Sequence, residues 1–337
     1  MNLSRPEFWS KKSLPGLLLW PVSIVFRLVA FLRRTMYRTG LLSSWRSPVP
    51  VVVVGNITVG GAGKTPLVIA LADLLAKHRY RVGIVTRGYG GSTKDVPAVA
   101  ISDSDPAVVG DESVLIASRT GLPVVVSSSR VAAVKHLIAN FDIDCVLCDD
   151  GLQHYALQRD LEIVVIDSEY LFGNGFCMPA GPLREPVKRL DTVDFKIYSG
   201  NNRNMSGDLP GYSLVGSNLV NVNDESDIAP IASFSGKRVH AVAGIASPAK
   251  FYDFLRAGSI DIVQHEFSDH ATYQRSDLLF NDDLPIVMTE KDRVKCSGFG
   301  LQNCWYLPVT ALLDDSVAAE LLTYIERVFS MRQSNAD

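Results

Sequence analysis

A buried strand, a glycine-rich loop and a helix follow one another near the start of the main body of this chain. Four valines, Val51–Val54, run into the loop Gly55–Gly63, and Lys64-Thr65 opens an apolar stretch at helical spacing. This order is typical of a P-loop, in which backbone N–H groups and the helix N-terminus surround phosphates. Lys64 would reach phosphate oxygens, and the Thr65 hydroxyl would hold magnesium. The segment therefore predicts a phosphate-binding site on an α/β fold.

The loop departs from the general P-loop pattern at one position. The glycine expected six residues before the lysine is Thr58, although Gly60, Gly61 and Gly63 can preserve the turn. Alternatively, the glycines only make a tight strand-to-helix turn, but this gives no reason for the Lys-Thr pair. The residues predicted to contact phosphate are Thr58, Val59, Gly60, Gly61, Ala62, Gly63, Lys64 and Thr65.

The rest of the body alternates short β-branched runs with helical stretches. Such alternation is typical of a parallel sheet sandwiched by helices. A second, smaller α/β pattern follows after about residue 236. In the first pattern the predicted strands are Val51–Val54, Arg81–Thr86, Pro123–Val126, Asp144–Cys148 and Leu161–Ile166, and the predicted helices are Leu67–His78 and Arg130–Asn140.

Length and composition suggest how the chain divides. At 337 residues it is long enough for two domains, and a stretch rich in Asn, Ser, Gly and Asp separates the two patterns. We predict a helical arm over 1–46, a P-loop domain over 47–200, a connector over 201–235 that can carry a β-hairpin through Tyr212–Val222, and a smaller α/β domain over 236–330.

Charge is distributed unevenly along the chain. Residues 1–46 hold eight Lys and Arg against one acid, Glu7, so this arm carries +7; with a net charge of −3, the remainder carries −10. A basic arm on an acidic body indicates an anionic partner for the arm, and nothing in the body resembles a nucleic-acid footprint. The five cysteines are scattered through apolar context, which fits a reducing, cytosolic location without disulfides.

The arm contains an almost continuous apolar run over residues 14–32 that ends in Arg33-Arg34. Pro15, Pro21 and Arg27 interrupt it, and a small-residue cleavage site is missing, so neither a clean span nor a signal peptide is a good match. We expect an interfacial helix that meets anionic lipid through its arginines. The alternatives are an amphipathic helix packed on the protein's own core and a true span. In either membrane case the arginines place the body on the cytoplasmic side.

Two acids, Asp149 and Asp150, end the strand predicted over Asp144–Cys148. Ligands bind at this edge of a parallel sheet, and a carboxylate there is the expected partner of P-loop magnesium. The alternative is that both are solvated loop acids.

Several further segments are shared with one family. They are Gly55–Pro66, Thr86–Gly90, Val109–Glu112, Asp149–His154, Gly181–Glu185, Phe267–His270 with Tyr273, and Thr289–Asp292. With these segments the chain resembles the tetraacyldisaccharide 4'-kinases, the lipid A 4'-kinases of Gram-negative envelope synthesis. The threonine at position 58 also fits the pattern of this family.

The resemblance implies roles for named residues and implies ATP and Mg²⁺ as cofactors. Asp111 takes the proton from the acceptor hydroxyl, and His270 orients Asp111 or tunes its pKa. Lys64 and Asp150 complete the expected catalytic set. The expected metal ligands are Thr65, Asp149 and Glu112, and the expected additional nucleotide contacts are Arg87, Glu290 and Lys291.

Taken alone, most of these residues have plainer interpretations. Gly110–Glu112 is equally well a helix start, where the helix dipole favours acids. His270 can be an ordinary histidine in a loop. Arg87 stands in a glycine-rich turn, and Glu290-Lys291 can be a solvated charged turn. For Arg184-Glu185 the sequence offers no mechanism.

The resulting hypothesis is a kinase on the cytoplasmic face of the bacterial inner membrane, peripheral or monotopic, that phosphorylates the 4'-hydroxyl of a tetraacylated disaccharide 1-phosphate. Two alternatives are a membrane-associated P-loop ATPase or GTPase switch and a kinase of a soluble metabolite. The sequence lacks the Asn-Lys-x-Asp segment with which GTPases bind guanine, which favours an ATPase over a GTPase as the form of the switch.

Overall fold

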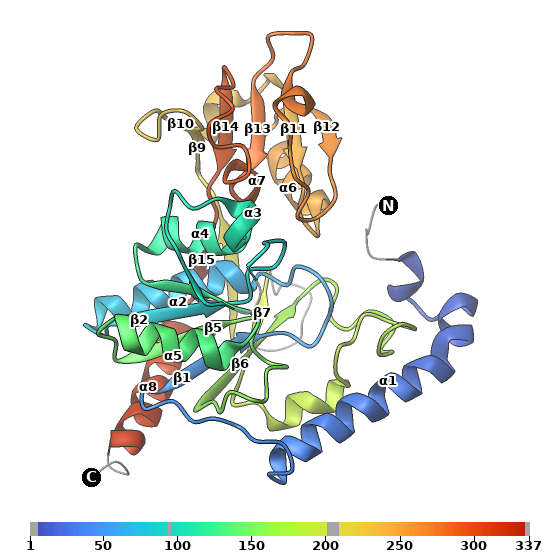
Figure 1. Cartoon of the computed structure of the whole chain (residues 1–337). Coiled ribbons are helices and arrows are strands. Elements are labelled where there is room, and N and C mark those ends of the chain that lie inside the picture. Colours follow the sequence, from blue (N-terminus) through green and yellow to red (C-terminus); the bar gives the residue numbers. More distant parts are fainter. Residues whose placement is uncertain (1–5, 94–95, 201–208, 334–337) are drawn as a thin grey trace.

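The computed structural model describes residues 6–93, 96–200 and 209–333. Two lobes, each built on a sheet, lie one above the other, and the long helix α1 (Leu14–Arg38) extends along one side of the larger lobe (Figure 1). The first part of the predicted connector, 201–208, lies outside the described residues.

The larger sheet contains nine described strands in the order β15-β8-β7-β6-β1-β5-β2-β4-β3. β3 pairs antiparallel with β4 and β15 antiparallel with β8, while the other neighbours are parallel. The strands are β1 (Val51–Gly55), β2 (Val82–Thr86), β3 (Ala98–Ala100), β4 (Val124–Val126), β5 (Cys145–Asp149), β6 (Leu161–Asp167), β7 (Phe195–Ser199), β8 (Gly211–Val215) and β15 (Thr310–Leu313). The parallel sheet predicted from the sequence is confirmed.

Helices cover both faces of this sheet, because successive strand side chains point to opposite sides. Val52 and Val54 of β1 pack in one core with residues of α2 (Lys64–Lys77), α4 (Asp111–Thr120) and α8 (Asp315–Gln333). Val51 and Val53 pack on the other face with α5 (Arg130–Asn140). A strand buried on both faces explains the continuous run of valines.

The smaller lobe has a sheet of six described strands in the order β10-β9-β14-β13-β11-β12. Its strands are β9 (Asn218–Asn221), β10 (Ile228–Pro230), β11 (Arg238–Ala243), β12 (Asp261–Glu266), β13 (Ile286–Thr289) and β14 (Cys304–Leu307). Helix α6 (Pro248–Ala257) packs in its core, and the short helix α7 (Glu290–Arg293) directly follows β13.

Sheet membership differs from the sequence-based division in two places. The predicted hairpin through Tyr212–Val222 is wrong, because β8 joins the larger sheet and β9 the smaller one, so the two strands bridge the lobes. Residues 310–330, which we expected in the smaller domain, return to the larger one: β15 pairs with β8, and α8 contributes Leu321, Ile325 and Phe329 to the larger core. Both features depend on contacts between segments that are far apart in the sequence, and local sequence patterns do not predict such contacts.

Helix α1 is continuous over 25 residues despite Pro15 and Pro21. Its length and composition suffice to cross a membrane, and only 11% of its most apolar window is buried. Twelve large apolar side chains of α1 are exposed, whereas Gly16 and Ser23 are buried. The helix therefore does not pack its apolar surface into the protein's own core, which argues against that alternative.

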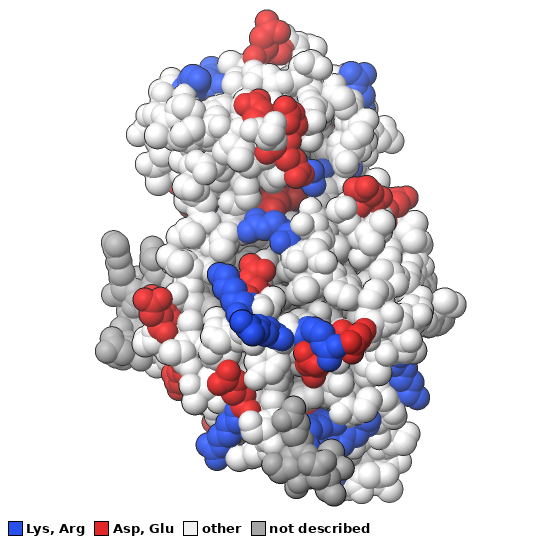
Figure 2. Space-filling view, turned by 90° about the vertical axis from the view of Figure 1, so that its left-hand side faces the viewer, with Lys and Arg blue, Asp and Glu red and all other residues white. Residues whose placement is uncertain are grey.

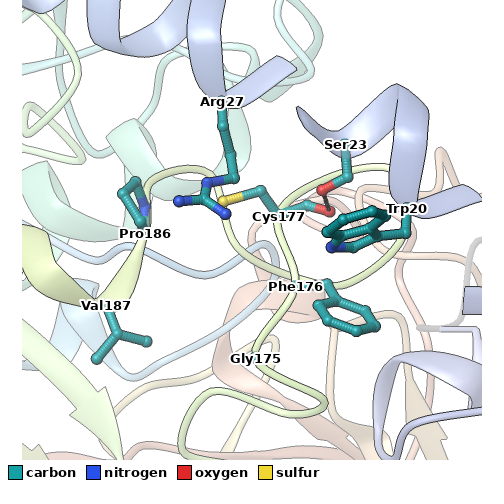
Figure 3. Close-up of a pocket in the computed structure, with 8 residues that line it drawn as sticks. All are labelled: Trp20, Ser23, Arg27, Gly175, Phe176, Cys177, Pro186 and Val187. Carbon is teal, nitrogen blue, oxygen red and sulfur yellow. Dashed lines mark hydrogen bonds between the residues drawn. The ribbon is translucent and has the colours of Figure 1, made fainter. Parts of the chain in front are cut away.

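A few residues attach α1 to the body. Ser23 Oγ donates a hydrogen bond to the carbonyl oxygen of Cys177 at 2.7 Å, and Arg34 donates to the Thr192 hydroxyl at 2.8 Å. Figure 3 shows a small pocket at this junction, with Arg27 of α1 pointing into it between Cys177 and Pro186. Its lining residues are Trp20, Ser23, Arg27, Gly175, Phe176, Cys177, Pro186 and Val187.

Candidate active site

The phosphate loop joins β1 to α2 as the sequence indicates. Gly60 and Gly63 have φ angles of 99° and 82°, the left-handed region that favours glycine. At Gly63 a Cβ atom would also lie 2.5 Å from the Tyr212 hydroxyl oxygen, and this hydroxyl donates to the Gly63 carbonyl at 2.6 Å. Helix α2 begins at Lys64, three residues before the predicted start, so Thr65 lies on its first turn.

A second segment supports the loop from the side. Thr58 forms an isolated antiparallel bridge with Leu183, and the Val59 N–H donates to the Pro182 carbonyl at 2.8 Å. This pairing ties the loop backbone to the segment that contains Pro182 and Leu183. It also brings Arg184 to the strand ends.

Asp150 lies between two cations. Arg184 donates to both of its carboxylate oxygens at 2.9 and 3.1 Å, and Lys64 Nζ lies 3.6 Å from Oδ1. Burial would raise the pKa of Asp150, but the charges of Lys64 and Arg184 outweigh it and lower the pKa below its ordinary value. Lys64 also donates to Asn56 Oδ1 at 3.3 Å. Asp150 and Asn56 thus orient the Lys64 ammonium. Arg184, for which the sequence offered no mechanism, in turn holds Asp150.

Asp149 is the buried carboxylate at the end of β5. Its side chain is 1% exposed, and Oδ1 has no hydrogen-bond partner among the described residues. Burial and the neighbouring charge of Glu112 raise the pKa of Asp149 to about 7. An orphaned buried carboxylate oxygen close to a second carboxylate and to Lys64 is the environment that a divalent cation would relieve.

These residues fit magnesium bound together with a nucleotide. Within the described ranges, three or more His, Cys, Asp or Glu side chains nowhere gather in a metal-holding arrangement. Magnesium in phosphate sites commonly uses one or two carboxylates, with phosphate oxygens and water supplying the rest. Asp149 and Glu112, with the Thr65 hydroxyl on the first turn of α2, match that donor set.

The structure brings Asp111 and His270 together from different lobes. His270 Nδ1 lies 2.9 and 3.0 Å from the two carboxylate oxygens of Asp111, and Asp111 is 4% exposed. Burial would raise the pKa of Asp111, but the hydrogen bond with His270 and the charge of Lys291 lower it below its ordinary value. Asp111 is also the first residue of α4, so the helix-start interpretation holds as well. A buried, ionised carboxylate oriented by an imidazole can accept a proton.

The glycine-rich turn after β2 lines the same region. The Tyr89 ring lies 4.6 Å from the His270 ring, and a Cβ on Gly88 would lie 2.8 Å from the Val109 carbonyl oxygen. Arg87 is exposed. The pKa of His154 is lowered to about 3, mainly by burial and to a smaller extent by the charges of Arg130 and Arg87. Basic and acidic side chains gather around the hollow where the two lobes meet (Figure 2). Arg87 directly follows β2 and so lies at the carboxyl ends of the strands.

Glu290 and Lys291 both have protein partners. Arg119 donates to both Glu290 oxygens at 3.0 Å, and Lys291 Nζ lies 3.1 Å from Glu112 Oε1. Neither side chain is a solvated turn residue, since Glu290 is buried and the Lys291 side chain is 15% exposed. The structure does not pair either of them with the phosphate loop.

The parallel sheet, the phosphate loop and the carboxylates at the strand ends define the class: a P-loop nucleotide-binding protein. The family model described as tetraacyldisaccharide-1-P 4'-kinase matches residues 16–326. The tetraacyldisaccharide 4'-kinase of Nitrosococcus oceani is 44% identical over 321 residues, covering 95% of this chain and 94% of the relative. That of Coxiella burnetii (strain RSA 331 / Henzerling II) is 41% identical and covers 99% of both chains.

A solved structure agrees with these relatives. The crystal structure of LpxK from Aquifex aeolicus in complex with ATP has a TM-score of 0.78 and 28% identity, covering 93% of this chain and 99% of the other. The chain belongs to the tetraacyldisaccharide 4'-kinase family, and the resemblance noted in the sequence is confirmed.

Proposed function

We propose that this protein transfers the γ-phosphoryl group of ATP to the 4'-hydroxyl of a tetraacyldisaccharide 1-phosphate, giving the 1,4'-bisphosphate. Family membership supports the substrate and the reaction, and the related LpxK structure contains ATP. The observation that carries the proposal is the pairing of Asp111 with His270 across the two lobes, beside a phosphate loop whose lysine is aimed by Asp150.

On the nucleotide side, the backbone of Thr58–Thr65 binds the phosphates, and Lys64 neutralises charge on the transferred group. Thr65, Asp149 and Glu112 would hold Mg²⁺, which neutralises phosphate oxygens when bound. Asp150 acts here by orienting Lys64, and the exposed Arg87 is a further anion contact at the strand ends.

On the acceptor side, Asp111 receives the proton of the attacking hydroxyl. Its lowered pKa keeps it ionised at neutral pH, and the hydrogen bond with His270 fixes the direction of its lone pairs. Phosphoryl transfer asks little covalent chemistry of the protein, so positioning and charge neutralisation dominate. Asp111 therefore contributes by orienting the hydroxyl as much as by accepting the proton.

The arm brings this site to the lipid. Helix α1 exposes apolar residues along most of its length and carries Arg27, Arg33, Arg34 and Arg38. Apolar side chains enter the acyl region of a bilayer while arginines meet anionic headgroups. In this arrangement the protein is held on the cytoplasmic face of the inner membrane, and the acyl chains stay in the bilayer while the sugar enters the site.

Labelled ATP tests the proposal. The full chain is incubated in mixed micelles with [γ-³²P]ATP and either the lipid disaccharide 1-phosphate or detergent alone. We expect label in the lipid and little inorganic phosphate in its absence. Steady hydrolysis without lipid product would instead indicate an ATPase switch, and label in an added soluble sugar but not in the lipid would indicate a metabolite kinase; either result overturns the proposal.

A further inference from the structure

Lys291 lies at the centre of a cluster of charged groups from both lobes. Its ammonium nitrogen is 3.1 Å from Glu112 Oε1, 3.2 Å from Asp269 Oδ1 and 3.3 Å from His270 Nε2. It is also 3.9 Å from Asp111 Oδ2. An ammonium group has three N–H donors, and the three nearest acceptors account for all of them. The lysine is therefore fully engaged by protein.

The contact with His270 fixes how the histidine carries its proton. A lysine ammonium can only donate, so His270 Nε2 must be the acceptor. A neutral imidazole that accepts at Nε2 carries its proton on Nδ1, because the bond made by one ring nitrogen sets the state of the other. His270 Nδ1 is the atom that faces the Asp111 carboxylate at 2.9 Å. The ionised Asp111 can only accept, so Lys291 and Asp111 favour the same tautomer, the one that donates to Asp111.

The element that carries Lys291 is itself held against both lobes. On one side of Lys291, Glu290 makes the paired hydrogen bonds with Arg119 near the end of α4. On the other side, Asp292 is fully buried and accepts from the Gly244 N–H at 2.9 Å and from the Tyr273 hydroxyl at 2.9 Å. Tyr273 follows His270 by three residues. The short helix α7 therefore has little freedom to move its lysine away from the histidine.

His270 needs such restraint. Its φ angle is 59°, in the left-handed region that a histidine seldom adopts, and it lies in the turn after β12 rather than in a helix or strand. Contacts from Lys291 at one ring nitrogen, from Asp111 at the other and from the Tyr89 ring at its face hold the imidazole in place.

We propose that Lys291 is a positioning residue of the phosphoryl transfer, which orients His270 and through it Asp111, and is not a contact of the nucleotide. The inference rests on the proposed function. Lys291 and His270 belong to the smaller lobe, whereas Asp111 and Glu112 belong to the larger one. Docking of the two lobes and orientation of the proton acceptor are consequently one event.

The variant Lys291→Met keeps the length of the side chain and removes its donors. We expect kcat for lipid phosphorylation to fall about 10- to 100-fold, because a misplaced proton acceptor loses part of the rate that general base catalysis supplies. KM for ATP should stay within about twofold of wild type. Lys291→Arg, which can still donate to His270 and Glu112, should recover part of the lost kcat. Thermal unfolding of each variant shows whether the fold is retained.

Lys250→Met is the matched control. Lys250 also reaches from the smaller lobe to the larger one, where it lies 3.0 Å from Asp167, but it does not contact His270. Its kcat should stay within about threefold of wild type. An equal loss of kcat in Lys250→Met and Lys291→Met would mean that general docking of the lobes, and not His270, is responsible, and would overturn the inference.

A second readout is independent of activity. The imidazole ¹⁵N shifts of the full chain in detergent report the tautomer of His270, which is assigned with a His270→Gln variant. Wild type should show the Nδ1–H form with Nε2 unprotonated. In Lys291→Met the nearest group to Nε2 becomes Asp269 Oδ2, 3.7 Å away, which can only accept, so the fraction of His270 with a proton on Nε2 should rise. An unchanged His270 signal, or a raised KM for ATP with normal kcat, would refute the positioning role. If wild type made no lipid product, the proposed function would be wrong. The spectrum would still show whether Lys291 positions His270, because it does not depend on activity.

Discussion

The phosphate loop and the Asp111–His270 pair are assembled in opposite ways. The loop is continuous in the chain from Gly55 to Thr65, and the segments that support it, at Leu183 and Tyr212, also belong to the larger lobe. The pair joins residues 159 positions apart on two lobes, and a third residue, Lys291, spans them again. The nucleotide half of the site can therefore exist in the larger lobe alone, whereas the acceptor half exists only when the lobes are docked.

This difference predicts which changes affect binding and which affect transfer. Substitutions in the loop should weaken both ATP binding and turnover. Substitutions in the pair should reduce turnover and leave ATP binding nearly intact.

Lys64→Met should have the largest effect. Loss of the ammonium that Asp150 aims at the phosphates should lower kcat about 10³-fold or more and weaken ATP binding as well. Kinase assays with lipid and calorimetry with ATP measure the two effects. A variant that turned over normally would show that the loop does not hold the transferred phosphate.

Asp111→Asn should come next. The amide keeps the shape of the side chain but cannot accept the proton, so kcat should fall about 10²- to 10³-fold, with the dissociation constant of ATP within about twofold of wild type. Single-turnover kinetics and calorimetry give the two numbers. If ATP affinity were lost instead, Asp111 would serve the nucleotide or the metal, and the contrast between the two halves would disappear.

The arm should show a smaller but clear effect. Leu18 and Val25 are 72% and 60% exposed on α1, so Leu18→Glu with Val25→Glu should reduce sedimentation with anionic vesicles about 10-fold or more. The control introduces Glu at Ile228 and Leu279, both 55% exposed on the smaller lobe. Equal binding of wild type and the α1 variant would rule out α1 as the membrane contact.

Arg184→Met should have the smallest effect, and one that depends on pH. The lowered pKa of Asp150 means that its ionised form stabilises the folded state above its ordinary pKa, near 4, and that this stability is lost as pH falls. Removing Arg184 should thus lower the free energy of unfolding by about 1 kcal/mol at pH 7, because the pair is partly exposed. The loss should be smaller at about pH 2.5, where Asp150 is protonated more in the variant than in wild type. Urea titrations at both pH values measure the difference, and a pH-independent loss would contradict this origin.

The same contrast explains what the sequence could predict. The loop, β1 and α2 follow from a local pattern of valines, glycines and a lysine, so the sequence predicts their positions to within a few residues. The residues of the acceptor half came from the family resemblance, because a single histidine in a loop has no local signal that points to Asp111.

Other features depend on contacts between distant segments and were missed. Arg184 binds Asp150, from which it is separated by 34 positions in the sequence. The Tyr212 hydroxyl donates to the Gly63 carbonyl from β8, for which the sequence predicts a hairpin. Helix α8 joins the larger lobe after the chain has completed the smaller one. Apolar periodicity predicts that such elements exist but not which sheet they cover.

The position of the transferred phosphate on the lipid distinguishes a 4'-kinase from any other lipid kinase. The lipid product made by the full chain from ATP is purified, and its phosphorus–proton correlations are recorded by NMR. We expect a new phosphomonoester coupled to the proton at the 4' carbon, formed by wild type and nearly lost in Asp111→Asn. A phosphate on another hydroxyl would contradict 4'-kinase activity, and undiminished product from Asp111→Asn would contradict the role of Asp111 as proton acceptor.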